Sequence, residues 1–206
     1  MMWLRGVVQG LAASVLLWNA WRLGHVPIFL PFALLLAVEA WMLLRNVTKR
    51  PLEVHRSGWA WAASVGVACF PVVVAWSVRG PIQEPWWRFE LSYVIQLVAL
   101  GLEVWALITL RICFSQLAEA HDVVRHGPYR YVRHPLYIAY GLGMFGSCVG
   151  ANRLVLWGLW LLFVGMEILR ARAEEQVLAR VFPTYRAYQA ETGMWFPRWR
   201  GGEGRC

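Results

Sequence analysis

Long apolar blocks constrain the fold of this chain more than any other feature. A helix needs about 20 mainly apolar residues to cross a bilayer. Six blocks approach this length, and only Ala151, Asn152 and Arg153 separate the last two. The blocks run from Gly6 to Trp21, Val26 to Leu44, Gly58 to Val78, Leu91 to Ile112, Leu136 to Gly150 and Leu154 to Leu169. This pattern predicts an all-α fold, a polytopic membrane helix bundle of about six spans whose last two form a tight hairpin.

Composition and charge agree with a membrane domain. Charged residues make up 16% of the chain, whereas soluble domains carry about 25%. Both termini and the even-numbered loops hold 16 of the 20 Lys and Arg residues, as expected for the cytosolic side of a membrane protein. This topology explains the net charge of +8 without nucleic-acid binding. We therefore expect one membrane domain over residues 1–206, cytosolic termini, and a first block kept as a span rather than cleaved as a signal peptide.

Two further patterns have a structural explanation. The segment from Gly141 to Gly146 reads Gly-Leu-Gly-Met-Phe-Gly and matches a dinucleotide-binding loop, but that loop requires a preceding strand. Small residues at this spacing inside an apolar block instead allow membrane helices to pack closely. The four cysteines have neither CxxC pairing nor metal-ligand spacing, so we expect them to be reduced and assign them no role.

Three acidic residues lie inside the apolar blocks, where a charge costs about 2.5–3.5 kcal/mol on insertion scales. A structural ion pair explains Glu39 and Glu103 as well as a functional role does, and they stay unassigned. Glu167, Arg170 and Glu174 follow the spacing i, i+3, i+7, which places them on one helical face. The sixth block continues directly into a charged helix, so this face is expected to run from the membrane into a cytosolic C-terminal helix.

The segment from His121 to Tyr137 precedes the predicted hairpin and holds three His, three Arg and three Tyr. Gly127 and Pro128 predict a turn, and Pro135 suits the first turn of the next helix. A cytosolic anchor explains the arginines but not the histidines beside a rigid turn. Because the histidines lack a compact ligand spacing such as HxxxH, no metal is expected here.

Two motifs carry a family resemblance. The first reads His-x-x-Val-x-x-Gly-Pro-Tyr-x-x-x-Arg-His-Pro-x-Tyr from His121 to Tyr137. The second reads Arg-x-x-x-Glu-Glu-x-x-Leu-x-x-x-Phe from Arg170 to Phe182. With the hairpin between them, these motifs resemble the isoprenylcysteine carboxyl methyltransferase family as far as Pro197. The stretch from Phe182 to Tyr185 is one residue shorter than in that family.

The resemblance implies a site for S-adenosyl-L-methionine within residues 113–206, with residues 1–112 forming the N-terminal spans. It places Arg170 on the substrate side as a catalytic residue, and Glu167 is the neighbouring carboxyl that we also consider catalytic. The implied reaction is carboxyl O-methylation of an isoprenylcysteine-like or other lipophilic, membrane-associated substrate at the cytosolic face. The implied cofactor contacts are His121, Asp122, Val123, Val124, Tyr129, His134, Pro135, Leu136, Tyr137 and Glu174.

The nucleophile stays open at this stage. A carboxylate needs no general base, and Arg170 would orient it with two hydrogen bonds. An amine or thiol must lose a proton, and Glu167 is the available base. A phospholipid N-methyltransferase and a small-thiol S-methyltransferase are therefore alternatives within the same chemistry. An NADPH-dependent membrane reductase and a non-catalytic membrane protein are alternatives from other classes.

Overall fold

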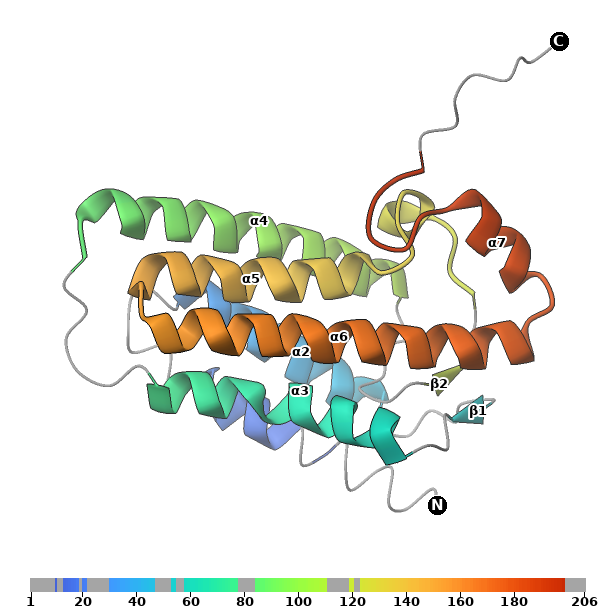
Figure 1. The fold of residues 1–206 in the computed structure, drawn as a ribbon, viewed down its shortest axis with the longest axis horizontal. Helices are drawn as coiled ribbons and strands as arrows, with labels where there is room; N and C mark the ends of the chain where they lie inside the picture. Colours follow the sequence, from blue (N-terminus) through green and yellow to red (C-terminus); the bar gives the residue numbers. More distant parts are fainter. Residues whose placement is uncertain are drawn as a thin grey trace, which may run out of the picture.

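The computed structural model describes residues 10, 13–18, 20–21, 30–46, 53–54, 58–77, 84–110, 119–120 and 123–198. The described chain is almost entirely helical (Figure 1), which confirms the all-α class. The helices are α2 (Leu30–Asn46), α3 (Gly58–Ser77), α4 (Trp86–Leu110), α5 (Pro135–Ala151), α6 (Leu154–Val181), α7 (Tyr185–Glu191) and the 3-10 turn η3 (Gly127–Arg130). Two short strands, β1 (Glu53–Val54) and β2 (Glu119–Ala120), pair antiparallel.

Helices α2 to α6 occupy the second to sixth predicted blocks. Among the described residues, α4 and α6 are long and apolar enough to cross a membrane, whereas crossing by all six blocks stays a prediction. Helix α4 begins at Trp86, five residues before the predicted start, because the N–H of Arg88 bonds to the carbonyl of Pro85 and closes a first turn there. The 28 residues of α6 span about 42 Å, more than the roughly 30 Å of a bilayer core.

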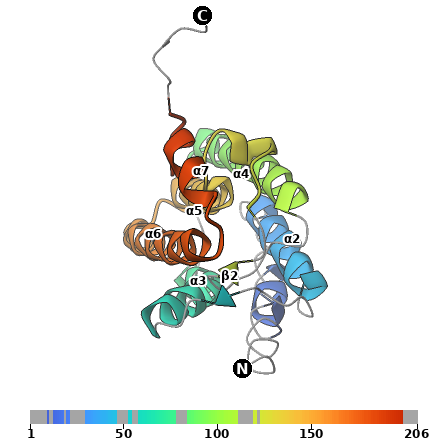
Figure 2. The same cartoon turned by 90° about the vertical axis from the view of Figure 1, so that its right-hand side faces the viewer.

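The long helices lie roughly along one direction (Figure 1). Helix α5 packs between α4 and α6, α3 packs on α6, and α2 packs on α4 (Figure 2). Helices α5 and α6 form the predicted tight hairpin. Asn152 makes this turn with a left-handed φ of 44°, a conformation that Asn tolerates better than most residues, and its N–H bonds to the carbonyl of Cys148.

The Gly141–Gly146 motif lies within α5, and its last glycine supports helix packing. The Ser92 hydroxyl on α4 donates to the carbonyl of Gly146 at 2.7 Å, and the Gln96 amide donates to Ser92 at 2.7 Å. A Cβ atom at Gly146 would lie 2.7 Å from Cγ of Gln96 and 3.2 Å from the carbonyl oxygen of Ser92. The close contact between α4 and α5 therefore requires glycine at this position, as the membrane-packing interpretation predicts.

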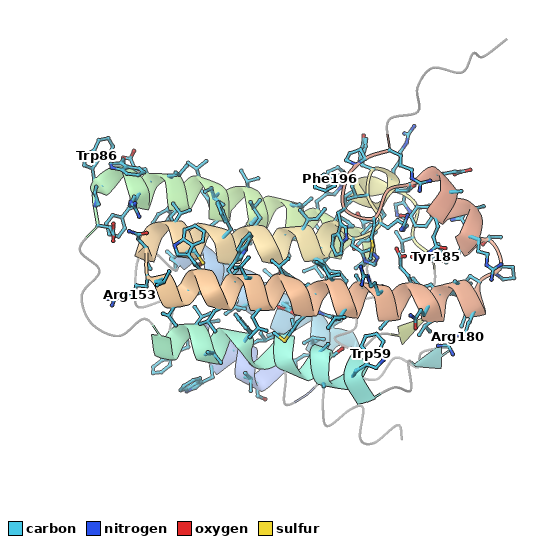
Figure 3. The ribbon with its side chains drawn as sticks, in the orientation of Figure 1. Trp59, Trp86, Arg153, Arg180, Tyr185 and Phe196 are labelled. Atoms are coloured by element: carbon cyan, nitrogen blue, oxygen red, sulfur yellow. The ribbon has the colours of Figure 1, made fainter. Side chains whose placement is uncertain are left out.

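The two ends of the bundle differ in what they carry (Figure 3). Trp86 and Arg153 lie at the end with the α5–α6 turn, while Tyr185 and Arg180 lie at the opposite end, where α6 meets α7. Turn η3 and the paired strands lie at this second end as well (Figure 1). The polar segments singled out in the sequence therefore gather at one end of the helices.

We predict that Gly146→Leu lowers the thermal unfolding temperature in detergent, as measured by differential scanning fluorimetry. The larger side chain would displace Gln96 and separate α4 from α5, and overpacking of this kind costs about 1–3 kcal/mol. Gly101→Leu on α4 is the matched control, because a Cβ atom there meets nothing within 4 Å. Equal unfolding temperatures for the two variants would contradict the packing role of Gly146.

A candidate site between the His121–Tyr137 motif and helix α6

The site begins at the turn that leads into α5. Gly127 has a φ of +58°, and a Cβ atom there would lie 2.6 Å from the hydroxyl of Thr109 on α4, so two constraints favour glycine. Pro128 lies in the first turn of η3, and Pro135 is the first residue of α5, where its missing N–H has no consequence. The predicted turn and helix start are both confirmed.

Arg133 joins this turn to two other segments. Its Nε donates to Oε1 of Glu175 on α6 at 2.6 Å, and its guanidinium also donates to the carbonyls of Gln189 and Thr192 at the end of α7. The backbone N–H of Arg133 bonds to the carbonyl of Gly193 at 2.9 Å. One side chain thus attaches the turn to α6 and to the segment that follows α7.

Glu175 is the acceptor at the centre of this junction. Besides Arg133, it receives Nε2 of His134 at 3.1 Å and the amide of Gln189 at 3.0 Å. Burial alone would raise the pKa of Glu175, but the hydrogen bonds and charges of His134 and Arg133 outweigh it and lower the pKa to about 2. Glu175 lies in the charged part of α6, beyond the apolar block that ends at Leu169.

The lowered pKa has a defined consequence for stability. A carboxyl with a lower pKa in the folded protein contributes stability above its ordinary pKa of 4.5, and loses that contribution as the pH falls toward 2. The interactions of Glu175 with His134 and Arg133 therefore make their full contribution to stability around neutral pH.

A second contact joins α5 to Glu174, the residue that precedes Glu175 on α6. The Tyr137 hydroxyl on α5 donates to Oε2 of Glu174 at 2.6 Å, and the ring of Tyr137 stacks on His134 with centroids 5.2 Å apart. The Arg170 guanidinium covers the other side of this region, 4.9 Å from the Tyr137 ring centroid, and lies 3.7 Å from the Glu167 carboxylate. The face predicted for Glu167, Arg170 and Glu174 therefore meets the first motif at Tyr137.

The structure brings most of the predicted residues to this region. Tyr129, His134, Pro135, Leu136 and Tyr137 are buried, and the Tyr129 carbonyl accepts the hydroxyl of Tyr188 at 2.5 Å. Val123 and Val124 are half-buried just before η3. Val123 packs against a buried cluster formed by Val177, Leu178, Tyr185 and Tyr188. The predicted contacts His121 and Asp122 lie outside the described residues.

Sequence reasoning assigned no role to Arg133, Glu175 or Tyr188, although all three lie in or near the quoted motifs. The adjacent pair Glu174–Glu175 was the available signal. Residues next to each other on a helix point about 100° apart. The two carboxylates can therefore both contact the first motif only if each one binds a different residue of it. Tyr137 and the Arg133–His134 pair are those partners.

A groove of about 390 Å³ between α5 and α6 borders the site. It is lined mainly by apolar side chains, among them Phe145, Trp160 and Phe163, and Trp195 and Phe196 flank it beyond α7. Its polar lining includes Tyr137 and Glu167. The volume falls in the range of small-molecule sites, and the shared residues connect the groove to the junction described above.

Within the described part of the chain, no group of three His, Cys, Asp or Glu side chains has the geometry to hold a metal ion.

Comparisons with known proteins agree with the motif assignment. A sequence model of the phospholipid methyltransferase family matches residues 87–185, from the first turn of α4 to the start of α7. This match confirms the resemblance to membrane methyltransferases that the two motifs predict. Together with the apolar helices α4 and α6, it indicates a membrane protein.

Two curated relatives are similar over part of their length. The cobalt-zinc-cadmium resistance protein CzcN of Cupriavidus metallidurans is 28% identical over 134 residues, which cover 54% of this chain and 62% of CzcN. The nickel-cobalt-cadmium resistance protein NccN of Alcaligenes xylosoxydans xylosoxydans is 33% identical over 81 residues, 39% of this chain and 38% of NccN. The matched segments thus span less than two thirds of either relative.

Arg133→Gln is expected to release the segment after α6, because it removes the charged donor to the carbonyls at the end of α7. Hydrogen bonds to charged groups contribute about 1.5–3 kcal/mol, so amide exchange over residues 185–191 should accelerate roughly tenfold or more. Hydrogen–deuterium exchange with mass spectrometry measures this rate. The control is Arg130→Gln, an exposed arginine in the same turn. Unchanged exchange in Arg133→Gln would show that the segment is held by other contacts.

Proposed function

We propose that this chain is an S-adenosyl-L-methionine-dependent methyltransferase that modifies a lipophilic acceptor at the membrane. The observation that carries the proposal is the meeting of the two motifs around Tyr137, with Glu174 on one side and Arg170 and Glu167 on the other. The adjoining groove offers apolar surface for the rest of an acceptor. The family match supports the methyl-transfer class.

The residues present fit such a cofactor by their chemistry. Glu174 has a carboxylate that can accept hydrogen bonds from ribose hydroxyls, a use of acidic residues in other nucleotide sites. Tyr129, His134 and Tyr137 provide buried aromatic surface for an adenine ring or a cation. Glu167 lines the groove between α5 and α6, and both of its carboxylate oxygens are buried without a hydrogen bond in the described structure, so they can accept one from a ligand in the groove.

S-adenosyl-L-methionine supplies an electrophilic methyl group on a sulfonium when it is bound. The contribution of the protein is then mainly alignment, and holding two reactants in line contributes about 7–11 kcal/mol to a barrier reduction. Arg170 is positioned to hold an acceptor, because the Tyr137 ring and Glu167 fix its guanidinium in place. Glu167 is the carboxyl that accepts a proton if the acceptor is an amine or a thiol.

The proposal includes an orientation. The basic residues gather on the side of the termini, so we assign the termini, the site and the C-terminal helix α7 to the cytosol of a multi-pass protein. A soluble nucleotide then reaches Glu174 from the cytosol, while a lipophilic acceptor reaches Glu167 through the groove between α5 and α6. This arrangement explains why one site has a charged side and an apolar side.

Glu174→Gln is predicted to weaken binding of S-adenosylhomocysteine roughly tenfold or more, since a hydrogen bond to a charged group contributes about 1.5–3 kcal/mol. Isothermal titration of the purified protein measures this affinity. Glu191→Gln, an exposed carboxyl on α7, is the matched control and should bind like the unmodified protein. If the unmodified protein binds NADPH and not S-adenosylhomocysteine, the reductase alternative replaces this proposal.

Acceptor turnover is predicted to depend steeply on the length of the acceptor's apolar tail. Each buried methylene contributes about 0.8 kcal/mol, so removing four should lower kcat/KM by roughly 200-fold. Transfer of a labelled methyl group to acceptors that share one headgroup measures the dependence. Val164→Trp narrows the groove and should reduce the advantage of long tails, whereas Leu161→Trp on the exposed face of α6 should not. A flat dependence on tail length would argue against the groove as the acceptor site.

A further inference from the structure

The lining of the α5–α6 groove ends at a group of aromatic residues. It follows one face of each helix, from Tyr137 to Phe145 on α5 and from Trp160 to Ile168 on α6. Lining residues recur about one turn apart on both helices, so they form two facing stripes. The turn at Asn152 makes the two helices run in opposite directions, and Phe145 therefore lies at the same end of the groove as Trp160.

Three aromatic rings meet at this end. The ring centroid of Phe145 lies 5.5 Å from those of Trp157 and Trp160, and the two tryptophan centroids lie 6.4 Å apart. Phe145 and Trp160 line the groove, and Trp157 packs behind them, about one turn nearer the α5–α6 turn. These three residues, which we call the aromatic end cluster, therefore close the groove on the side away from Glu167.

A hydrogen bond fixes the end cluster to α5. The indole N–H of Trp160 donates to the backbone carbonyl of Gly141 at 2.9 Å, which holds the Trp160 ring across the gap between the helices. Gly141 also lines the groove, and a Cβ atom added there would lie 4.0 Å from Cγ2 of Val164, an ordinary contact distance. The groove thus has free space at Gly141 and is filled by aromatic rings beyond it.

We propose that the aromatic end cluster limits the length of the apolar tail that an acceptor places in the groove. The inference rests on the proposed function and defines the class of acceptor by its tail. The lining from Tyr137 to Phe145 covers eight helical steps, about 12 Å. An extended chain advances roughly 1.2 Å per bond, so about ten bonds of a tail fill the groove. Carbons beyond that length lie outside it.

This limit distinguishes the groove from one that is open at both ends. A methylene buried in the groove should raise kcat/KM about fourfold. A methylene beyond the end cluster makes no further contact with the groove, so its contribution should disappear. In a groove that is open at both ends, the gain would continue with each added carbon.

The end cluster lies far from the proposed cofactor contacts. Phe196 flanks the groove at the end that carries α7, and Arg153 marks the opposite end (Figure 3). Trp157 follows Arg153 by about one turn, and Trp160 precedes Glu174 by 14 residues, or about 21 Å along α6. Changes in the end cluster should therefore leave the affinity for S-adenosylhomocysteine within about twofold.

Two variants test the limit in opposite directions. Trp160→Ala removes part of the end cluster, whereas Gly141→Leu fills the groove before the tail reaches it. The probes are alkylamines, alkanoates and alkanethiols with saturated tails from hexyl to octadecyl, and transfer of a labelled methyl group measures their turnover. Each variant is compared with the unmodified protein at every tail length, because partitioning of a probe into the membrane is then the same on both sides of the comparison.

The two variants should change the length profile differently. Trp160→Ala should gain at least about tenfold in kcat/KM over the unmodified protein for tails longer than about ten carbons, because two or more further methylenes find room. Gly141→Leu should lose at least about tenfold for decyl and longer tails and stay within about threefold for hexyl tails.

Trp105→Ala is the matched control, because it removes the same side chain from a position on α4 that is 49% exposed. It should keep the length profile of the unmodified protein. If Trp160→Ala and Gly141→Leu share that profile, the end cluster does not limit the tail and the inference is wrong. If scanning fluorimetry shows that Trp160→Ala does not fold, Phe145→Ala removes the end cluster from the α5 side and must show the same gain.

Photolabelling locates the tail independently of turnover. Hexadecylamine and palmitate that carry a diazirine at about the tenth carbon are added to the full chain in lipid nanodiscs, and mass spectrometry identifies the labelled residues. Label on Phe145 or Trp160 supports the inference, whereas label on Leu161 and Leu162 of the outer face without either of these refutes it. Failure of the unmodified protein to bind S-adenosylhomocysteine would instead defeat the proposed function, and the labelled positions would still decide where the tail lies.

Discussion

The rest of the site depends on the junction between the Arg133–Tyr137 segment and the charged half of α6. Glu175 accepts hydrogen bonds from Arg133 and His134, while Glu174 accepts one from Tyr137. Because neighbouring helical residues point about 100° apart, the two carboxylates bind different parts of the same segment and fix its orientation. The α5–α6 turn already joins these helices at their other end. The hairpin is thus held at both ends, which keeps Tyr137 and Arg170 in contact.

The buried charged side chains inside this bundle would destabilise the fold if their partners were not held in place. Arg170 is 1% exposed, and a charge at this depth persists in a membrane helix only where fixed partners compensate it. Glu167 and the Tyr137 ring are such partners on two sides. The outward face of α6 is apolar by contrast, with Leu161 and Leu162 exposed. Charged side chains inside the bundle and leucines on its outer face suit the proposed meeting of a soluble cofactor with a lipophilic acceptor.

Hydropathy alone predicted the helices well, because the requirement for an apolar span is local in sequence. The α5–α6 hairpin deviates from its predicted bounds by one residue at its first helix, whereas α4 begins early because a charged, aromatic stretch after Pro85 is also helical. The motifs predicted that α5 and α6 share a site, but not that Glu175 binds His134. That contact depends on how the two helices are rotated against each other.

The movement of charge during methyl transfer gives the two residues of the Arg170–Glu167 pair different parts in the proposed reaction. Methyl transfer from a sulfonium removes a positive charge from the donor. With a carboxylate acceptor, two opposite charges cancel, so the contribution of Arg170 is largest before the transfer. With an amine acceptor, the positive charge moves to the nitrogen, and a carboxylate at Glu167 would stabilise it after the transfer. Preorganised groups lower a barrier when they are placed where charge develops, so the separate effects of replacing Arg170 and Glu167 would distinguish the two kinds of acceptor.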